Sequence, residues 1–242
     1  MVLSYRRAEV WKNGETLWTD VIAKYPDKDA RPYACRGLYY KEKEQQEKAL
    51  KDFSKDLAIN PGDVEILQFR GNIFFNLGKD DSAYADYIRA LKIKQDNALA
   101  LANLGAIYVR RNQYDSALIN LSKALAMDTS QYTAYANRAV VYSATGRFDE
   151  SIADFKMYLK SKPDDERVCF SIGMIYFDRG AFNECIGWFN KAIAIKPGFA
   201  NYHWMRSQAY KQTGNKKAAM ADATLALDLG MSIPKEYFNS IK

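Results

Sequence analysis

The chain has 242 residues and a mass of 27.6 kDa, which is long enough to bury a substantial core. Charged residues make up 26% and hydrophobic residues 48%, a balance that excludes low-complexity disorder, collagen and a disulfide-stabilised miniprotein. With 13 Gly and 6 Pro, the chain has too few turn residues for an all-β protein. A single His and 3 Cys leave little material for a metal site. Composition therefore predicts a helical protein that binds rather than catalyses.

The net charge is +6 and the pI is near 9.0. Most of the positive excess lies in residues 166–242, which hold 10 basic and 6 acidic residues. Elsewhere the two signs are interleaved, as in Lys41-Glu42-Lys43-Glu44. A nucleic-acid-binding protein usually concentrates its positive charge in a stripe. The pattern therefore predicts a solvated surface, no nucleic-acid partner and a mild preference for acidic partners.

The three cysteines, Cys35, Cys169 and Cys185, show no C-x-x-C spacing and no metal-ligand pattern. We expect them to be unbridged thiols that pack as small hydrophobic residues. No stretch approaches the ~20 apolar residues that a membrane span needs. The first 14 residues lack the apolar core of a signal peptide. We therefore expect no direct membrane insertion by this chain.

In chain order, residues 1–29 are predicted to form a partial repeat, with one helix over 2–13 that Gly14 stops and a second helix that Pro26 ends. From residue 30 the sequence repeats every 34 residues without gaps. The full repeats are 30–63, 64–97, 98–131, 132–165, 166–199 and 200–231. Residues 232–242 are predicted to form a short C-terminal capping helix that begins with Ser232. Its apolar side chains are expected to cover the last repeat: Ile233, Tyr237, Phe238 and Ile241.

Similar residues recur at fixed places in the repeats. A small residue at the eighth position is followed three residues later by an aromatic one, as with Gly105 and Tyr108. A second small residue stands at position 20, and a bulky one follows four residues later, as with Ala117 and Leu121. Each repeat thus holds two apolar segments with helical spacing and a turn between them. One helical hairpin cannot bury its apolar face alone, so the hairpins are expected to stack.

This period and pattern resemble the tetratricopeptide repeat, W-x2-L-G-x2-Y…A-x3-F…P. The best match lies in residues 169–197, and the resemblance covers residues 30–231. It implies an all-α fold, a right-handed α-solenoid of helix-turn-helix repeats, in a single domain over residues 1–242. Some repeats depart from this pattern at single positions. For example, Glu44 stands where four other repeats have a glycine.

The resemblance implies that the first helices of the repeats line a concave channel for a protein or an extended peptide. Toward the C-terminal end this channel gains large apolar side chains, which mark interaction surfaces where they are exposed. The peptide-binding residues expected there are Phe170, Met174, Phe177, Trp204 and Gln208. The alternative is that the rings pack against a neighbouring repeat or under the C-terminal helix.

Asn103 and Asn137 occupy one column in successive repeats. In the repeat region of O-GlcNAc transferase, a ladder of asparagines in this column binds the backbone of an extended peptide. An amide side chain donates to a carbonyl and accepts from an N–H at once, so it binds backbone of any sequence. The resemblance implies this role for Asn103 and Asn137. The alternative is that both are ordinary polar residues on a helix face.

The sequence offers no catalytic, cofactor-binding or metal-binding constellation. His203 is the single imidazole, and it stands in a column where a packed ring is expected. Cys169 lies in the same column one repeat earlier, roughly 10 Å away by helix packing distances, which is too far for a nucleophile and its base. No HExxH motif, Gly-rich phosphate loop or paired Cys motif occurs. We therefore expect no enzyme activity, no cofactor and no metal.

Two functions fit these features. The first is a protein- or peptide-binding scaffold. The second comes from residues 5–26, YRRAEVWKNGETLWTDVIAKYP, which resemble the start of the soluble repeat region in polytopic membrane glycosyltransferase-like proteins. That resemblance implies a domain that positions a substrate or partner for a membrane enzyme, and a periplasmic location in bacterial relatives. A whole protein of the first kind is expected to be cytoplasmic.

Overall fold

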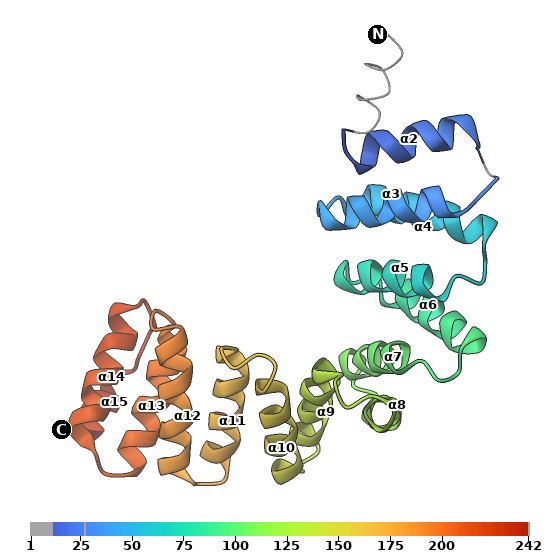
Figure 1. Ribbon diagram of the computed structural model, residues 1–242. Coiled ribbons are helices and arrows are strands. Elements are labelled where there is room, and N and C mark those ends of the chain that lie inside the picture. The colour runs from blue at the N-terminus through green and yellow to red at the C-terminus, as the bar shows by residue number, and fades with distance from the viewer. Residues whose placement is uncertain (1–11, 27, 242) are drawn as a thin grey trace. The chain divides into compact units, whose positions relative to one another are not determined.

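The computed structural model describes residues 12–26 and 28–241. These residues form helices joined by short turns, and no strand lies among them (Figure 1). The all-α class that the sequence predicts is therefore confirmed. The chain divides into two compact units, residues 1–134 and 135–242. The division falls within helix α9 (Tyr132–Ala144).

The N-terminal unit contains three complete helical hairpins. Its helices are α2 (Gly14–Lys24), α3 (Arg31–Glu42), α4 (Gln46–Ile59), α5 (Val64–Asn76), α6 (Asp80–Ile93), α7 (Ala98–Arg110) and α8 (Tyr114–Met127). Helices α3 and α4, α5 and α6, and α7 and α8 pair within hairpins, and the second helix of one hairpin packs against the first helix of the next. The apolar face of each hairpin is thus covered by a neighbouring hairpin or helix, as stacked hairpins require.

The C-terminal unit repeats this arrangement. Beyond α9 its helices are α10 (Phe148–Leu159), α11 (Glu166–Asp178), α12 (Phe182–Ile195), α13 (Ala200–Gln212), α14 (Lys216–Asp228) and α15 (Lys235–Ser240). Helices α11 and α12 form one hairpin and α13 and α14 the next, and α12 packs against α13.

Helix α2 begins with a capping box. The Asn13 side chain accepts a hydrogen bond from the Thr16 N–H at 2.9 Å, and Thr16 Oγ1 accepts one from the Asn13 N–H at 3.3 Å. Gly14 is therefore the first residue of a helix, and the prediction that it stops one is wrong. The predicted helix over residues 2–13 lies almost wholly outside the described residues.

The small residues at position eight lie where the two helices of a hairpin approach most closely. A Cβ atom at Gly105 would lie 2.6 Å from Leu121 Cγ, and one at Gly37 would lie 2.6 Å from Phe53 Cε1. The residues at position 20 are fully buried: Ala49, Ala83, Ala117, Ser151, Cys185 and Ala219. Close approach of the two backbones therefore explains both small columns.

Each described hairpin turn contains one residue in the left-handed backbone region. Four turns use a glycine there: Gly78, Gly146, Gly180 and Gly214. Two others use residues with a side chain, Glu44 at φ 57° and Asn112 at φ 55°. Asn tolerates this region better than Glu, whose side chain makes it cost about 1–2 kcal/mol. The turn at Glu44 is therefore strained.

The C-terminal segment packs against the last hairpin. Ile233, Tyr237 and Phe238 lie against the buried Ala223 and Ala226 of α14. The helix begins only at Lys235, with Pro234 at the N-cap and no side-chain cap. The prediction that Ser232 caps this helix is therefore wrong, because Ser232 lies before the N-cap in a stretch without regular secondary structure.

Candidate functional site

Two amide side chains join the first helices of neighbouring hairpins in the N-terminal unit. Asn103 on α7 donates from Nδ2 to Oδ1 of Asn72 on α5 at 2.8 Å. The Tyr87 hydroxyl donates to the same oxygen at 2.6 Å. Burial raises the pKa of the Tyr87 phenol far above its usual range, so this hydroxyl stays protonated and remains a donor. Both hydrogen bonds orient the Asn72 amide with its oxygen toward Tyr87 and Asn103.

This orientation leaves hydrogen-bonding groups unused. Among the described residues, neither the Nδ2 of Asn72 nor the Oδ1 of Asn103 has a protein partner. Both side chains are half-buried rather than sealed. Leu99 lies one turn before Asn103 on the same face of α7, and it is 38% exposed. The first helices therefore present a fixed donor, a fixed acceptor and an apolar neighbour.

The structure places Asn103 in the N-terminal unit and Asn137 in the C-terminal unit. Asn137 is half-buried on α9. Because the two residues belong to different units, their joint role toward a peptide backbone stays a prediction.

The aromatic side chains expected to bind a peptide are half-buried in packing contacts. Phe170 stacks on Phe189 with a centroid separation of 5.1 Å, and its ring lies 4.7 Å from that of Tyr202 in the next hairpin. Phe177 meets the ring of Phe182 edge to face at 5.5 Å. These contacts agree with the alternative that the rings pack against neighbouring helices. Part of each ring nevertheless stays exposed.

Trp204 lies under the C-terminal segment. Its ring is 4.6 Å from that of Tyr237, at an interplanar angle of 64°. Gln208, one turn further along α13, donates from Nε2 to the Met205 sulfur at 3.3 Å. Met174 packs in the same cluster as Phe170 and Phe177. The structure thus gathers three of the predicted residues on α11 and two on α13.

Sequence reasoning missed an ion pair that recurs inside the hairpins. The pairs are Arg36 with Asp52, Arg70 with Asp86, Arg138 with Asp154, and Arg206 with Asp222. In each, the guanidinium donates two hydrogen bonds to a carboxylate 16 residues later. The remaining two full repeats have Leu104 with Asn120 and Ile172 with Trp188 at these positions. The pairing could have been detected in the sequence, because the two positions hold Arg and Asp together in four repeats and neither of them in the other two.

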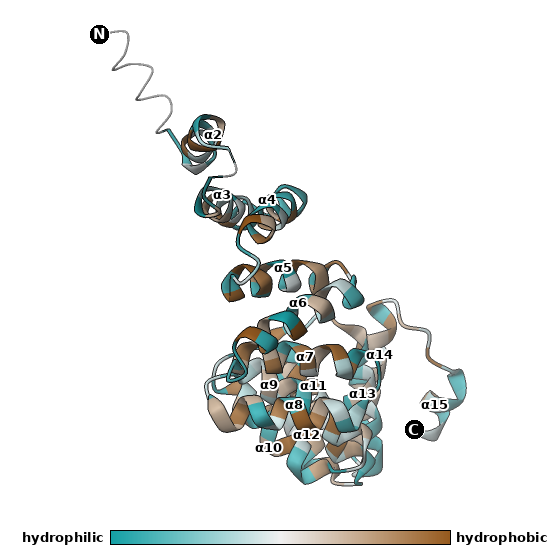
Figure 2. Ribbon diagram, turned by 90° about the vertical axis from the view of Figure 1, so that its right-hand side faces the viewer, coloured by the Kyte–Doolittle hydropathy of each residue, from teal (hydrophilic) through white to brown (hydrophobic). Residues whose placement is uncertain are grey.

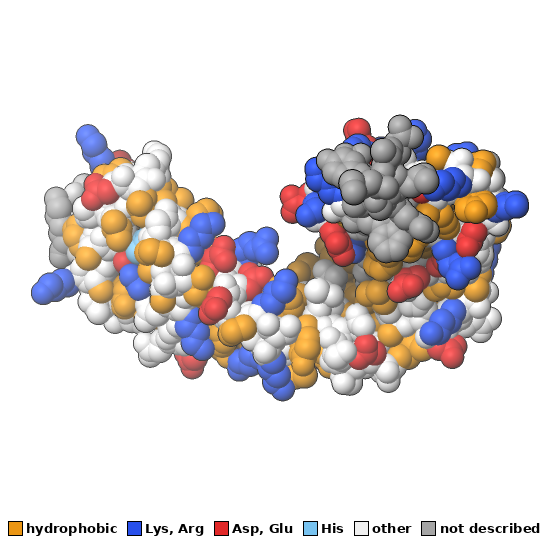
Figure 3. Space-filling model, turned by 45° about the horizontal axis from the view of Figure 1, so that its top comes forward, with side chains coloured by type: hydrophobic (Ala, Val, Ile, Leu, Met, Phe, Trp, Pro, Cys, Tyr) orange, Lys and Arg blue, Asp and Glu red, His pale blue; other side chains and the backbone are white. Residues whose placement is uncertain are grey.

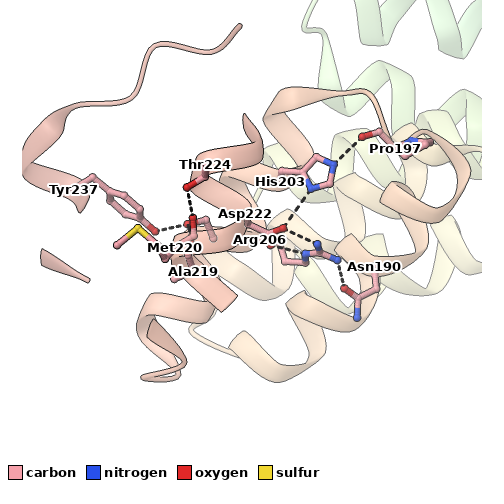
Figure 4. A network of polar contacts seen from close by, with 10 residues as sticks. Asn190, Pro197, His203, Arg206, Ala219, Met220, Asp222, Thr224 and Tyr237 are labelled. Carbon is pink, nitrogen blue, oxygen red and sulfur yellow. Dashed lines mark hydrogen bonds and ion pairs between the residues drawn. The ribbon is translucent and has the colours of Figure 1, made fainter. Parts of the chain in front are cut away.

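His203 is a buried structural residue in the last hairpin (Figure 4). Its Nε2 lies 2.7 Å from the Pro197 carbonyl oxygen, which accepts its hydrogen, and its Nδ1 lies 3.3 Å from Asp222 Oδ1. Arg206 reaches both Asp222 and the Asn190 side chain at 2.7 Å. This network ties α12, α13 and α14 together, in agreement with the packed ring expected at His203.

The three cysteines are free thiols, as predicted, with Cys169 and Cys185 buried and Cys35 half-buried. Burial raises the pKa of the Cys185 thiol to about 12, which makes it a poor nucleophile. Within residues 12–26 and 28–241, no group of three or more His, Cys, Asp or Glu side chains is placed to hold a metal ion. None of the helices in these ranges combines the length and apolarity that crossing a membrane requires.

Charged side chains on the surface are mixed in sign. Figure 3 shows Lys and Arg interspersed with Asp and Glu over the visible face. Some form ion pairs within a unit, such as Arg110 with Asp80 and Arg179 with Asp149. The interleaving seen in the sequence therefore persists on this face of the folded protein.

Sequence profiles of one repeat family match most of the chain. A profile described as "TPR repeat" matches residues 71–110, and two described as "Tetratricopeptide repeat" match residues 102–166 and residues 166–199 and 200–229. With the hairpins described above, these matches show that the chain belongs to the tetratricopeptide repeat family. No curated protein matches the sequence significantly.

Solved structures show the same fold. PilW, a type IV pilus biogenesis factor, is 21% identical with a TM-score of 0.70, and the match covers 88% of this chain and 97% of PilW. A tetratricopeptide repeat protein from Parabacteroides merdae is 20% identical with a TM-score of 0.65, over 98% of this chain and 94% of that one. YrrB, described as having an unusual peptide-binding site, is 20% identical with a TM-score of 0.64, over 74% and 92%. At these identities the likeness shows the fold alone.

Proposed function

We propose that this protein is a non-catalytic scaffold that binds an extended segment of a partner protein along the first helices of its hairpins. The observation that carries the proposal is the side-chain hydrogen bond between Asn72 and Asn103. It holds two amides on adjacent first helices in fixed orientations and leaves a donor and an acceptor unused.

An extended peptide unit offers one carbonyl and one N–H. The free Nδ2 hydrogens of Asn72 suit the carbonyl, and the free Oδ1 of Asn103 suits the N–H. Because the Tyr87 hydroxyl already fixes the Asn72 amide, little side-chain entropy is lost when a peptide binds. The pair therefore supports recognition of backbone rather than of a particular side chain.

The C-terminal unit, taken by itself, offers a separate surface for apolar side chains of a partner. Phe170, Met174 and Phe177 gather on α11 and keep part of their surfaces exposed. An apolar side chain of the partner covers these surfaces, and burial of apolar area supplies most of the affinity. YrrB, which shares the fold, is itself described as having a peptide-binding site, and this supports the same use of the fold here.

A peptide-array screen followed by calorimetric titration tests the proposal. The double variant Asn72→Ala with Asn103→Ala removes both unused groups, and each hydrogen bond contributes about 1 kcal/mol, so affinity falls by about tenfold or more. Asn76→Ala, at the exposed end of α5, is the matched control and leaves affinity unchanged. Peptides that bind the double variant as tightly as the wild-type protein contradict the proposal, provided that both melt at similar temperatures.

The second function predicted from the sequence rests on residues 5–26, of which residues 5–11 lie outside the described ranges. It stays a prediction.

A further inference from the structure

The C-terminal helix α15 is attached to the last hairpin by side-chain contacts. The Tyr237 ring lies against Trp204, and its hydroxyl is 2.7 Å from Ser207 Oγ. Lys211 donates from Nζ to Ser240 Oγ at 2.8 Å. Among the described residues, no backbone hydrogen bond joins α15 to α13 or α14. Tyr237 makes the ring contact and the hydroxyl contact of this attachment, and the buried Ile233 and Ile241 flank the helix on either side.

The hydrogen bonds at Ser207 suit a phenol. The Ser207 hydroxyl donates its hydrogen to the Ala219 carbonyl at 2.7 Å, so its oxygen acts as the acceptor for Tyr237. A ring without a hydroxyl leaves this buried acceptor unpaired, which costs affinity. We call the site formed by Trp204, Ser207 and Ala223 the tyrosine notch.

The notch exists because the last hairpin lacks a large side chain. In the preceding hairpin, the Phe189 ring covers Gly173, which stands in the same column as Ser207. The column of Phe189 holds bulky residues in five repeats, but Ala223 in the last: Phe53, Tyr87, Leu121, Phe155 and Phe189. Helix α14 therefore leaves space beside Ser207, and the Tyr237 ring enters the same cluster from another segment.

Helix α15 is poorly suited to be a permanent part of the core. It has six residues, none of them buried, although Ile233 before it and Ile241 after it are buried, and a helix of this length is not stable alone. The stretch from Met231 to Pro234 that leads to it has no regular secondary structure (Figure 2). A short terminal helix that makes no backbone hydrogen bond to its neighbours opens at a lower free energy than the long helices of the hairpins.

We infer that α15 is the resident occupant of the tyrosine notch and that a partner segment presenting a tyrosine replaces it. The inference deepens the proposed function, on which it rests, by naming the side chain that a partner brings to the C-terminal unit. While α15 is in place, the Tyr237 ring occupies the notch and covers part of Trp204. Replacement keeps the ring contact and the phenol bond but supplies them from another chain.

A labelled synthetic peptide of residues 231–241, MSIPKEYFNSI, is the probe. Fluorescence anisotropy measures its binding to the full chain, to Tyr237→Ala and to Tyr237→Phe. The wild-type protein binds weakly, because its own tethered segment competes at a high effective concentration. Tyr237→Ala binds at least tenfold more tightly, and Tyr237→Phe falls between the two. The probe with Phe in place of Tyr binds about fivefold more weakly, as expected for one lost hydrogen bond.

Hydrogen exchange of the wild-type protein gives a second test that needs no variant. The amides of α15 are expected to exchange much faster than those of α13. Exchange at equal rates overturns the inference, because α15 is then a fixed part of the fold. Equal binding of the probe to the wild-type protein and to a folded Tyr237→Ala variant, or no binding to that variant, also overturns it.

The two proposals fail in different ways. The probe reports only on the notch, whereas the Asn72 and Asn103 variants report only on the N-terminal unit. If the probe behaves as expected but array peptides ignore the amide variants, the backbone-binding proposal fails and the notch stands. The opposite pattern overturns the notch alone.

Discussion

Arg70 on α5 and Asp86 on α6 are joined by two parallel hydrogen bonds, 2.8 Å from Nε and 2.7 Å from Nη2. The Asp86 side chain is only 6% exposed. A paired guanidinium and carboxylate fix both distance and orientation, so the bond sets how the two helices of this hairpin lie against each other.

Replacing Arg70 by Leu is expected to destabilise the protein by about 3 kcal/mol, because it leaves the buried Asp86 carboxylate without a cation. Adding Asp86→Asn creates the pair that another repeat carries as Leu104 and Asn120, and it should recover most of the loss. Urea denaturation of the single and double variants measures both effects. Equal stability of the two variants contradicts the account.

Gly105→Leu is expected to destabilise the hairpin of α7 and α8 by about 1–3 kcal/mol, because even its Cβ would lie 2.6 Å from Leu121 Cγ. Gly187→Ala is the control, since no atom lies within 4 Å of the added Cβ. That change should stabilise α12 by about 0.5–1 kcal/mol through helix propensity. Thermal melts decide the matter: a Gly105→Leu protein with the wild-type melting temperature shows that the contact is misplaced.

Asp56 on α4 is 1% exposed, and neither of its carboxylate oxygens has a hydrogen-bond partner among the described residues. Burial, with the nearby Asp63 and Asp29 carboxylates, raises the pKa of Asp56 to about 6. Between about pH 4 and pH 6, the folded protein therefore keeps the Asp56 carboxyl protonated. The unfolded chain, with an ordinary Asp pKa near 4, has released this proton. Stability from this group is present below pH 4 and is lost as pH rises through 6.

Asp56→Ala, which introduces the residue found in this column at Ala90 and Ala124, should stabilise the protein by about 2 kcal/mol at pH 7.5. The gain should shrink as the pH falls toward 4, where the wild-type carboxyl is neutral. Melting curves at pH 7.5 and pH 4.5 measure the difference, with the exposed Asp96→Ala as control. A gain that is the same at both pH values argues against a buried, titrating Asp56.

Glu44→Gly should stabilise the turn between α3 and α4 by about 1 kcal/mol, because glycine adopts the left-handed region without strain. Gly78→Ala is the reciprocal change in the next hairpin. No atom lies within 4 Å of the added Cβ there, so only the backbone penalty at φ 71° acts, and it should destabilise by a similar amount. Chemical denaturation that shows both changes with the same sign refutes this explanation.

The sequence predicted the parts of the fold that depend on repeated apolar packing. Gly105 and Leu121 stand in columns that recur every 34 residues, so the same packing pattern can be seen several times within one sequence. The pairing of Arg70 with Asp86 was missed, because charged residues inside a hairpin do not follow the apolar pattern. Comparison of the two columns across the repeats would have shown it.

The candidate site was less predictable. Phe170 and Trp204 were identified from their columns, but the rings that cover them, Tyr202 and Tyr237, belong to the following segments. A column alone does not tell how much of a ring the next helix covers. Asn72 was not singled out because it stands three positions later in its repeat than Asn103 does, and only the stacking of α5 against α7 brings the two together.

The most direct test of the peptide-binding proposal is nuclear magnetic resonance of the side-chain amides of Asn72 and Asn103 during titration with an array-selected peptide. We predict that both amide signals shift along one saturable curve, while that of the exposed Asn76 stays in place. Peptide binding that saturates without moving either the Asn72 or the Asn103 signal would contradict it.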